Sequence, residues 1–208
     1  MSSTILFLGD SITDAEHLWL PEYQNLGNGF VYILQNYFSS HGLDYKCINK
    51  GQDGFTTSAL LRILPQVLAE TKPDFIHLLI GINDVGVAMN TGTTLEKLHF
   101  AENFRSILDQ LSQTGASLLC SGPFLFPHPA RRIHWMPSVI KAEQVIKKET
   151  EERDILFLPL HAGLNEIALQ DGYDAITIDG IHLTSQGHHI LAQKILSNCF
   201  NDTGIKII

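Results

Sequence analysis

This sequence carries an early serine and three Asp-x-x-His pairs, which are residue types suited to nucleophilic catalysis. Ser11 follows a short apolar run and has Asp10 directly before it. A serine hydroxyl is a weak nucleophile until a base removes its proton, and the base needs a partner that orients it. An Asp-x-x-His spacing can supply both groups in one loop. The pairs are Asp14/His17, Asp74/His77 and Asp179/His182.

Two of the three pairs have surroundings that do not favour catalysis. His77 lies within "DFIHLLIG", a run typical of a strand buried on both faces, where a hydrogen-bonded core histidine is expected. Asp14 and His17 would share one face of a helix that starts at Ser11, so His17 would point away from the hydroxyl. We interpret His17 as a surface or loop histidine.

The third pair lies in a polar loop near the end of the chain, "IDGIHLTSQGHH". Thr184 is a suitable N-cap for a final helix, so the loop precedes that helix. Asp179 and His182 are therefore the preferred orienting acid and base. A plain turn at Asp179-Gly180 is the alternative reading of the same residues.

Two further polar stretches follow predicted strands. Asn83 lies in "GINDVG", where its amide can donate a hydrogen bond into a site or close a local turn. Gly51 lies in "NKGQDG", where its backbone N–H can approach a ligand closely or can serve a turn alone. Either stretch alone is a weak indication, and the turn reading is favoured for each.

The elements that position these residues read as alternating strands and helices. Short, wholly apolar runs predict buried parallel strands at residues 4–8, 45–48, 74–80, 117–121 and 155–158. Apolar stripes of helical period predict helices around residues 30–38, 60–68, 101–111, 139–148 and 191–199. This order predicts an α/β fold in one domain, residues 1–208, and places the polar stretches at the carboxyl edge of the sheet.

Composition excludes several classes of function. The chain has a net charge of −8, which gives no electrostatic support for nucleic-acid binding. No run approaches the length of a membrane span. The first apolar stretch, Ile5 to Leu8, has no basic region before it and is too short for a signal peptide, so we expect a cytoplasmic protein. The cysteines, Cys47, Cys120 and Cys199, lie in apolar surroundings and read as buried thiols rather than as metal or redox sites.

Taken together, the polar stretches resemble the four blocks of the SGNH, or GDSL-type, hydrolases. The resemblance spans residues 4 to about 199, and its strength lies in the order and placement of the blocks. Three of the blocks follow the first three predicted strands, and the fourth precedes the terminal helix. The blocks are Gly9-Asp10-Ser11, Asn49-Lys50-Gly51, Gly81-Ile82-Asn83-Asp84 and Asp179-Gly180-Ile181-His182.

The resemblance implies a flavodoxin-like, three-layer α/β/α sandwich with a parallel sheet of about five strands. It implies hydrolysis of small acyl or acetyl esters, or of thioesters, without a cofactor or metal. Ser11 would be the nucleophile, His182 the base and Asp179 the group that orients it. The oxyanion hole would comprise the Ser11 and Gly51 N–H groups and the Asn83 side chain. The expected partner is a small-molecule ester such as an acetylated sugar.

The substrate pocket is sought in the bulky segment at residues 121–135. Its side chains could line an acyl or sugar pocket, and its arginines could meet an anionic group. A partly packed loop with solvated arginines is the alternative. The candidate binding residues are Phe124, Phe126, Arg131 and Trp135.

Two other functions remain open on the sequence. A metal-dependent phosphoesterase could use Asp10, Asp14 and His17, because clustered carboxylates suit Mg²⁺ or Mn²⁺. That reading gives Asn83, Asp179 and His182 no shared purpose. A non-catalytic binding module on the same fold is the second alternative, since a fold does not guarantee activity.

Overall fold

A parallel sheet forms the centre of the computed structural model, which describes residues 3–20, 25–201 and 204–205. The strand order is β2-β1-β3-β4-β5. The neighbouring strands pair in parallel throughout, which confirms the predicted fold class. The strands are β1 (Ser3–Gly9), β2 (Tyr45–Gly51), β3 (Phe75–Leu79), β4 (Ser117–Ser121) and β5 (Leu156–Leu158).

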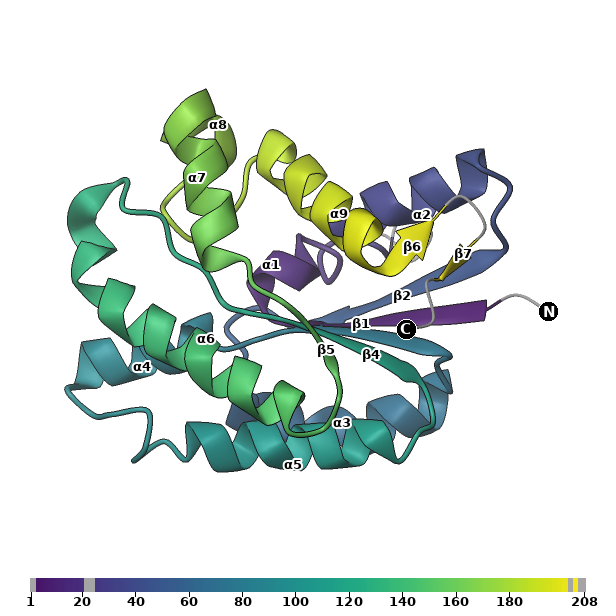
Figure 1. Ribbon diagram of the computed structural model, residues 1–208, viewed down its shortest axis with the longest axis horizontal. Helices are drawn as coiled ribbons and strands as arrows, with labels where there is room; N and C mark the ends of the chain where they lie inside the picture. The colour runs from purple at the N-terminus through teal and green to yellow at the C-terminus, as the bar shows by residue number, and fades with distance from the viewer. Residues whose placement is uncertain (1–2, 21–24, 202–203, 206–208) are drawn as a thin grey trace.

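Helices cover both faces of this sheet, as Figure 1 shows. One face carries α1 (Ser11–Asp14), α2 (Phe30–Ser40), α7 (His161–Asp171), α8 (Tyr173–Ile176) and α9 (Ser185–Cys199). The other carries α3 (Thr57–Thr71), α4 (Ile82–Thr91), α5 (Phe100–Ser112) and α6 (Met136–Glu151). The strands are therefore buried on both sides, which explains why their sequences are apolar without alternation.

The core confirms several residue-level expectations. His77 is fully buried in β3, and its Nε2 lies 2.8 Å from Ser121 Oγ. Burial lowers the pKa of His77 to about 3, so the ring is neutral. The three cysteines are buried as expected. Thr184 caps α9, with its hydroxyl oxygen accepting the Gly187 N–H at 3.1 Å.

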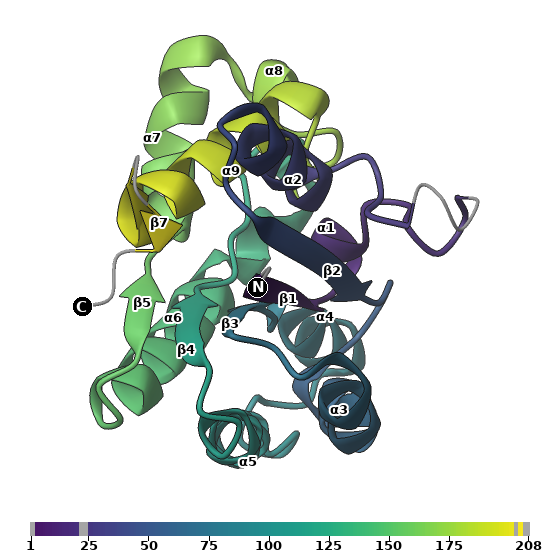
Figure 2. The same ribbon diagram turned by 90° about the vertical axis from the view of Figure 1, so that its right-hand side faces the viewer.

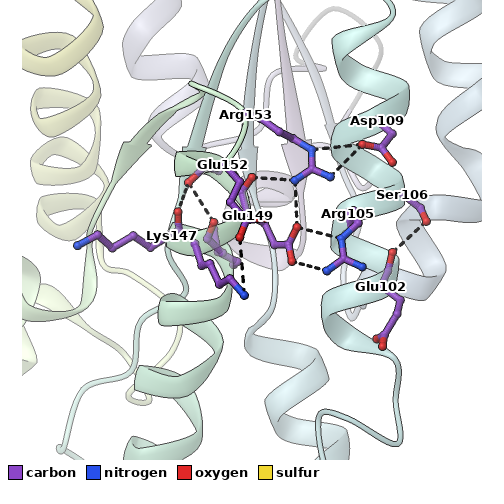
Figure 3. Close-up of polar contacts among 11 residues, drawn as sticks. Glu102, Arg105, Ser106, Asp109, Lys147, Glu149, Glu152 and Arg153 are labelled. Carbon is purple, nitrogen blue, oxygen red and sulfur yellow. Dashed lines mark hydrogen bonds and ion pairs between the residues drawn. The ribbon is translucent and has the colours of Figure 1, made fainter.

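An ion-pair network joins α5 to α6 on the face that carries α3–α6 (Figure 3). Glu149 is almost fully buried and accepts hydrogen bonds from Arg105 at 2.6 and 3.1 Å. Arg153 donates to the same carboxylate at 3.0 Å and also bonds Asp109. Two guanidinium groups thus compensate one buried charge.

Several elements go beyond the sequence prediction. A six-residue 3₁₀ helix, η2 (Ala130–Trp135), lies inside the segment where the substrate pocket was sought. A small antiparallel pair, β6 (Phe200–Asn201) and β7 (Gly204–Ile205), follows α9. The helices α4, α7 and α8 were also not predicted. Within the described residues, no helix combines the length and hydrophobicity that a bilayer crossing requires.

The carboxyl edge of the sheet gathers segments that are distant in the chain. Figures 1 and 2 show α1 beside the carboxyl end of β1, with the amino-terminal half of α9 on the same side of the molecule. The turn after β3 leads directly into α4. Catalytic groups in open α/β folds are expected at this edge.

Candidate active site

Ser11 begins the short helix α1 in a tight turn after β1. The turn is stabilised by Asp10, whose Oδ1 accepts the Ile12 N–H at 3.1 Å and caps the helix. Gly9 permits the close approach, since a Cβ there would lie 2.3 Å from Thr13 Oγ1 and 2.4 Å from the Leu79 carbonyl oxygen. These contacts hold Ser11 just beyond the buried strand β1, and Ser11 is partly exposed.

A hydrogen-bonded chain connects Ser11 to the preferred Asp-x-x-His pair. Ser11 Oγ lies 3.0 Å from His182 Nε2. His182 Nδ1 lies 3.2 Å from Asp179 Oδ2. This is the geometry in which an imidazole can accept the hydroxyl proton while a carboxylate holds the ring orientation.

The loop from Asp179 to His182 is braced by its own backbone. Asp179 Oδ1 accepts the N–H groups of Ile181 at 3.0 Å and His182 at 2.9 Å. Burial opposes ionisation of this carboxyl, but these hydrogen bonds and the nearby His182 hold its pKa below the ordinary value. Gly180 adopts φ +93°, which favours glycine, and Thr177 bonds across the loop to the His182 carbonyl. These contacts thus favour the ionised form of Asp179.

Asn83 lies in the first turn of α4, just past the carboxyl end of β3. Its Nδ2 donates to the Phe55 carbonyl at 3.0 Å, which fixes the amide and leaves its second N–H available. The Ser11 N–H makes no hydrogen bond to another described residue. Asn83 and Ser11 therefore retain the donors that the sequence interpretation gives them.

The expectation for Gly51 needs correction. Its N–H is already used, because it donates to Asn49 Oδ1 at 2.9 Å. Gly51 instead serves packing, since a Cβ there would lie 2.2 Å from Asp14 N. The exposed Gly54, at φ +72°, has an N–H that makes no bond to a described residue. Among the described residues, that N–H is one backbone donor of the loop after β2 that remains available.

A cavity of about 460 Å³ opens beside Ser11 and His182. Its rim carries two conspicuously exposed apolar side chains, Trp19 at 82% and Ile178 at 70%. Asp53 also lines it. A mixed apolar and polar wall of this kind suits a small uncharged ester. Neither Trp19 nor Ile178 was singled out from the sequence, because both are ordinary loop residues there.

The segment at residues 121–135 does not form this cavity. Phe124 and Phe126 are fully buried in the core, and Trp135 is nearly so, because the segment turns inward across the sheet edge. Arg131 is exposed, and none of these four lines the cavity. The expectation that they bind substrate is therefore not supported by their positions. The side chain of Arg132, which belongs to the same segment, contacts Asp179.

A second histidine lines the cavity wall and was missed in the sequence. His188 Nδ1 accepts the Phe30 N–H at 3.3 Å, which places the proton of the neutral ring on Nε2. Burial, with a smaller contribution from nearby His182, lowers the pKa of His188 to about 4. His188 is therefore an uncharged hydrogen-bond donor near neutral pH.

The residues of the metal alternative are engaged elsewhere. Asp10 caps α1, and Asp14 is paired with His17 Nδ1 and with the Leu18 N–H. His17 lies in the turn after α1, which agrees with the interpretation as a loop histidine, and its side chain is only 9% exposed. In residues 3–20, 25–201 and 204–205 no three His, Cys, Asp or Glu side chains are grouped to hold a metal ion. The donor set that a phosphoesterase would need is not assembled.

A Ser-His-Asp arrangement at the carboxyl edge of a parallel α/β sheet is typical of a hydrolase with a serine nucleophile. The chain belongs to the GDSL-like lipase/acylhydrolase family, whose model matches residues 7–190. This confirms the resemblance seen in the four sequence blocks.

Individual proteins that are similar to this chain are named as esterases. An acetylxylan esterase from Geobacillus stearothermophilus is 28% identical over 92% of this chain and 91% of its own. Esterase TesA from Pseudomonas aeruginosa is 31% identical over 61% of this chain and 57% of its own. A solved acetylxylan esterase from G. stearothermophilus superposes with a TM-score of 0.83 at 25% identity, covering 100% of this chain and 98% of that one.

Proposed function

We propose that this protein hydrolyses small acyl or acetyl esters through an acyl-enzyme on Ser11, with the chain acting as a single catalytic domain. His182 takes the Ser11 proton as the hydroxyl attacks the ester carbonyl, and then returns it to the leaving alcohol. In the second half of the reaction, His182 takes a proton from water as the water attacks the acyl-enzyme. The carboxylic acid product then leaves, and His182 returns the proton to Ser11 Oγ. Asp179 stays ionised, orients His182 and stabilises the imidazolium.

The observation that carries this proposal is the chain from Ser11 Oγ through His182 to Asp179, at 3.0 and 3.2 Å. A plain turn at Asp179-Gly180 would not require His182 to contact a serine 171 positions before it. Solved structures of the related acetylxylan esterase include catalytic mutants in which a serine, an aspartate or a histidine is replaced by alanine. The same three residue types meet here.

The tetrahedral intermediate needs fixed donors. We assign this role to the Ser11 N–H, the free N–H of the Asn83 amide and the Gly54 N–H in place of that of Gly51. The positive end of α1 adds little, because the helix is only four residues long. Removal of one such donor typically lowers the rate by about 10²–10³.

The cavity favours short acyl groups on a polar alcohol. Its moderate volume limits the acyl chain, whereas the exposed Trp19 offers a flat apolar face to a sugar ring. Asp53 and the neutral His188 can bond to ring hydroxyls. The name of one relative, an acetylxylan esterase, supports the same substrate class.

Hydrolysis of p-nitrophenyl acetate tests the proposal. We expect the wild-type rate to be insensitive to chelators, and both Ser11→Ala and His182→Ala to remove nearly all turnover. Full activity in Ser11→Ala would overturn the nucleophile assignment. A loss of wild-type activity with EDTA would favour the metal-dependent alternative.

A further inference from the structure

Arg132 contacts the orienting carboxylate from outside the catalytic loop. Its Nη1 donates to the Asp179 carbonyl oxygen at 2.9 Å and lies 3.4 Å from Asp179 Oδ2. Oδ2 is the same oxygen that faces His182 Nδ1. The Arg132 guanidinium and the catalytic imidazole therefore share one carboxylate oxygen.

Arg132 is itself held in place by a buried aromatic ring. Its Cζ lies 5.6 Å from the ring centre of Trp135, which is 7% exposed. The Trp135 ring packs on Gly86 of α4, where an added Cβ would lie 3.4 Å from the ring. The helix α4 also carries Asn83. A series of contacts therefore connects α4 to Trp135, Trp135 to Arg132, and Arg132 to Asp179.

The same segment contacts the catalytic loop at a second point. The Phe126 N–H donates to the Gly180 carbonyl at 2.8 Å. A Cβ at Gly180 would lie 3.3 Å from the Phe126 carbonyl oxygen. Residues 122–135 thus hold the loop through hydrogen bonds to two of its backbone carbonyls, those of Asp179 and Gly180.

We propose that Arg132 is a positioning residue, and that residues 122–135 brace the catalytic Asp179–His182 loop rather than line a substrate pocket. This inference rests on the catalytic roles proposed above for Ser11, His182 and Asp179. The guanidinium favours the ionised carboxylate and fixes the carbonyl and Oδ2 together, which orients the acceptor for His182. Arg132 does not touch the reacting atoms, so its effect passes through Asp179.

Arg132→Met tests the inference, because methionine keeps much of the side-chain length and removes both the charge and the donors. We expect kcat for p-nitrophenyl acetate to fall about tenfold with KM nearly unchanged. Arg132→Lys should recover part of the loss, since it restores the charge without the planar fork. The concentration of active sites is measured by titration with a serine-directed phosphonate. Because kcat is calculated per active site, misfolded protein does not lower it.

Arg153→Met is the matched control for losing an ion-paired arginine. Arg153 bonds Glu149 and Asp109 on the α5–α6 side, away from the cavity. We expect this control to lower the melting temperature and to leave kcat within about twofold. A kcat loss equal to that of Arg132→Met would contradict a specific role for Arg132.

A double-mutant cycle separates positioning from general destabilisation. If Arg132 acts through Asp179, Arg132→Met should change kcat less than about twofold in an Asp179→Ala background. The inference is overturned if the factor is the same in both backgrounds, or if Arg132→Met alone keeps full kcat. Activity retained by Ser11→Ala would instead overturn the proposed function, so the two failures are distinguishable.

Discussion

Ser11 Oγ and His182 Nε2 lie 3.0 Å apart although 171 positions separate the two residues in the sequence. The first strand delivers Ser11, and the loop before the last helix delivers His182. The contact is therefore a product of the tertiary fold and not of neighbouring residues. The contact brings the polar stretches near the two ends of the chain into one site.

Loss of the orienting acid should be less damaging than loss of the base. We expect His182→Ala to lower kcat by roughly 10⁴ or more, and Asp179→Ala to lower it by a smaller factor, because a poorly oriented imidazole can still accept a proton. Steady-state hydrolysis of p-nitrophenyl acetate measures both. Equal losses would mean that Asp179 does more than orient the ring.

Asp10 should make stability depend on pH. Burial raises its pKa to about 7, whereas an unfolded aspartate has a pKa of about 3.9. Between these values the folded state keeps a proton that the unfolded state has lost. This contribution to the free energy of unfolding is therefore fully present below about pH 4 and lost as the pH rises through about 7.

Asp10→Asn removes that titration while keeping an oxygen that can accept the Ile12 N–H. We expect the free energy of unfolding of the variant, relative to wild type, to rise by roughly 2.5 kcal/mol between pH 5 and pH 8. Urea unfolding at both pH values measures the difference. An unchanged difference would show that Asp10 is ionised in the folded protein at pH 5.

The Glu149 network should contribute to stability but not to catalysis. Glu149→Gln leaves Arg105 and Arg153 without their shared charge, and we expect a loss of about 1–2 kcal/mol at pH 7. Hydrogen bonds from Arg105, opposed by burial, hold the pKa of Glu149 below its ordinary value. The stabilisation is thus present above about pH 4.5 and disappears as the pH falls through the folded pKa.

Urea unfolding and kcat are measured together for this variant. Lys147→Met, which removes only the exposed pair with Glu151, is the control and should cost less than about 0.5 kcal/mol. A drop in kcat per titrated active site for Glu149→Gln would contradict the prediction, because it would show that the network also affects catalysis.

Trp19 should affect binding of the alcohol part of the substrate. It is 82% exposed at the rim of the cavity, where stacking on a sugar ring is worth roughly 1 kcal/mol. We expect Trp19→Ala to raise KM about fivefold for an acetylated xylo-oligosaccharide and to leave KM for p-nitrophenyl acetate nearly unchanged. Equal effects on both substrates would argue against a sugar-binding face.

The sheet and the positions of the residues proposed for catalysis could be predicted from the sequence, because strand indications are local and because the four polar stretches, each weak alone, together resemble the blocks of the GDSL-type hydrolases. The five apolar runs match the five strands, and each polar stretch lies where its strand or helix places it. His77 was recognised as a core residue from its neighbours alone. The placement of Ser11, Asn83, Asp179 and His182 follows from this local pattern and from the topology of a parallel sheet.

The errors arose where function depends on contacts between distant segments. Gly51 reads as a free donor until Asn49 is seen to occupy its N–H. The aromatic residues Phe124 and Phe126 resemble pocket residues, but the segment folds inward. Arg131 and Arg132 are equivalent in the sequence, and only the tertiary fold turns Arg132 toward Asp179.

Covalent labelling tests the central claim, that Ser11 is the activated nucleophile, most directly. The protein is treated with a serine-directed phosphonate and its intact mass is recorded, for wild type, Ser11→Ala and His182→Ala. The account predicts one adduct per wild-type chain, none in Ser11→Ala, and very slow labelling in His182→Ala. A single adduct that persists in Ser11→Ala, or no adduct in the wild type, would contradict it.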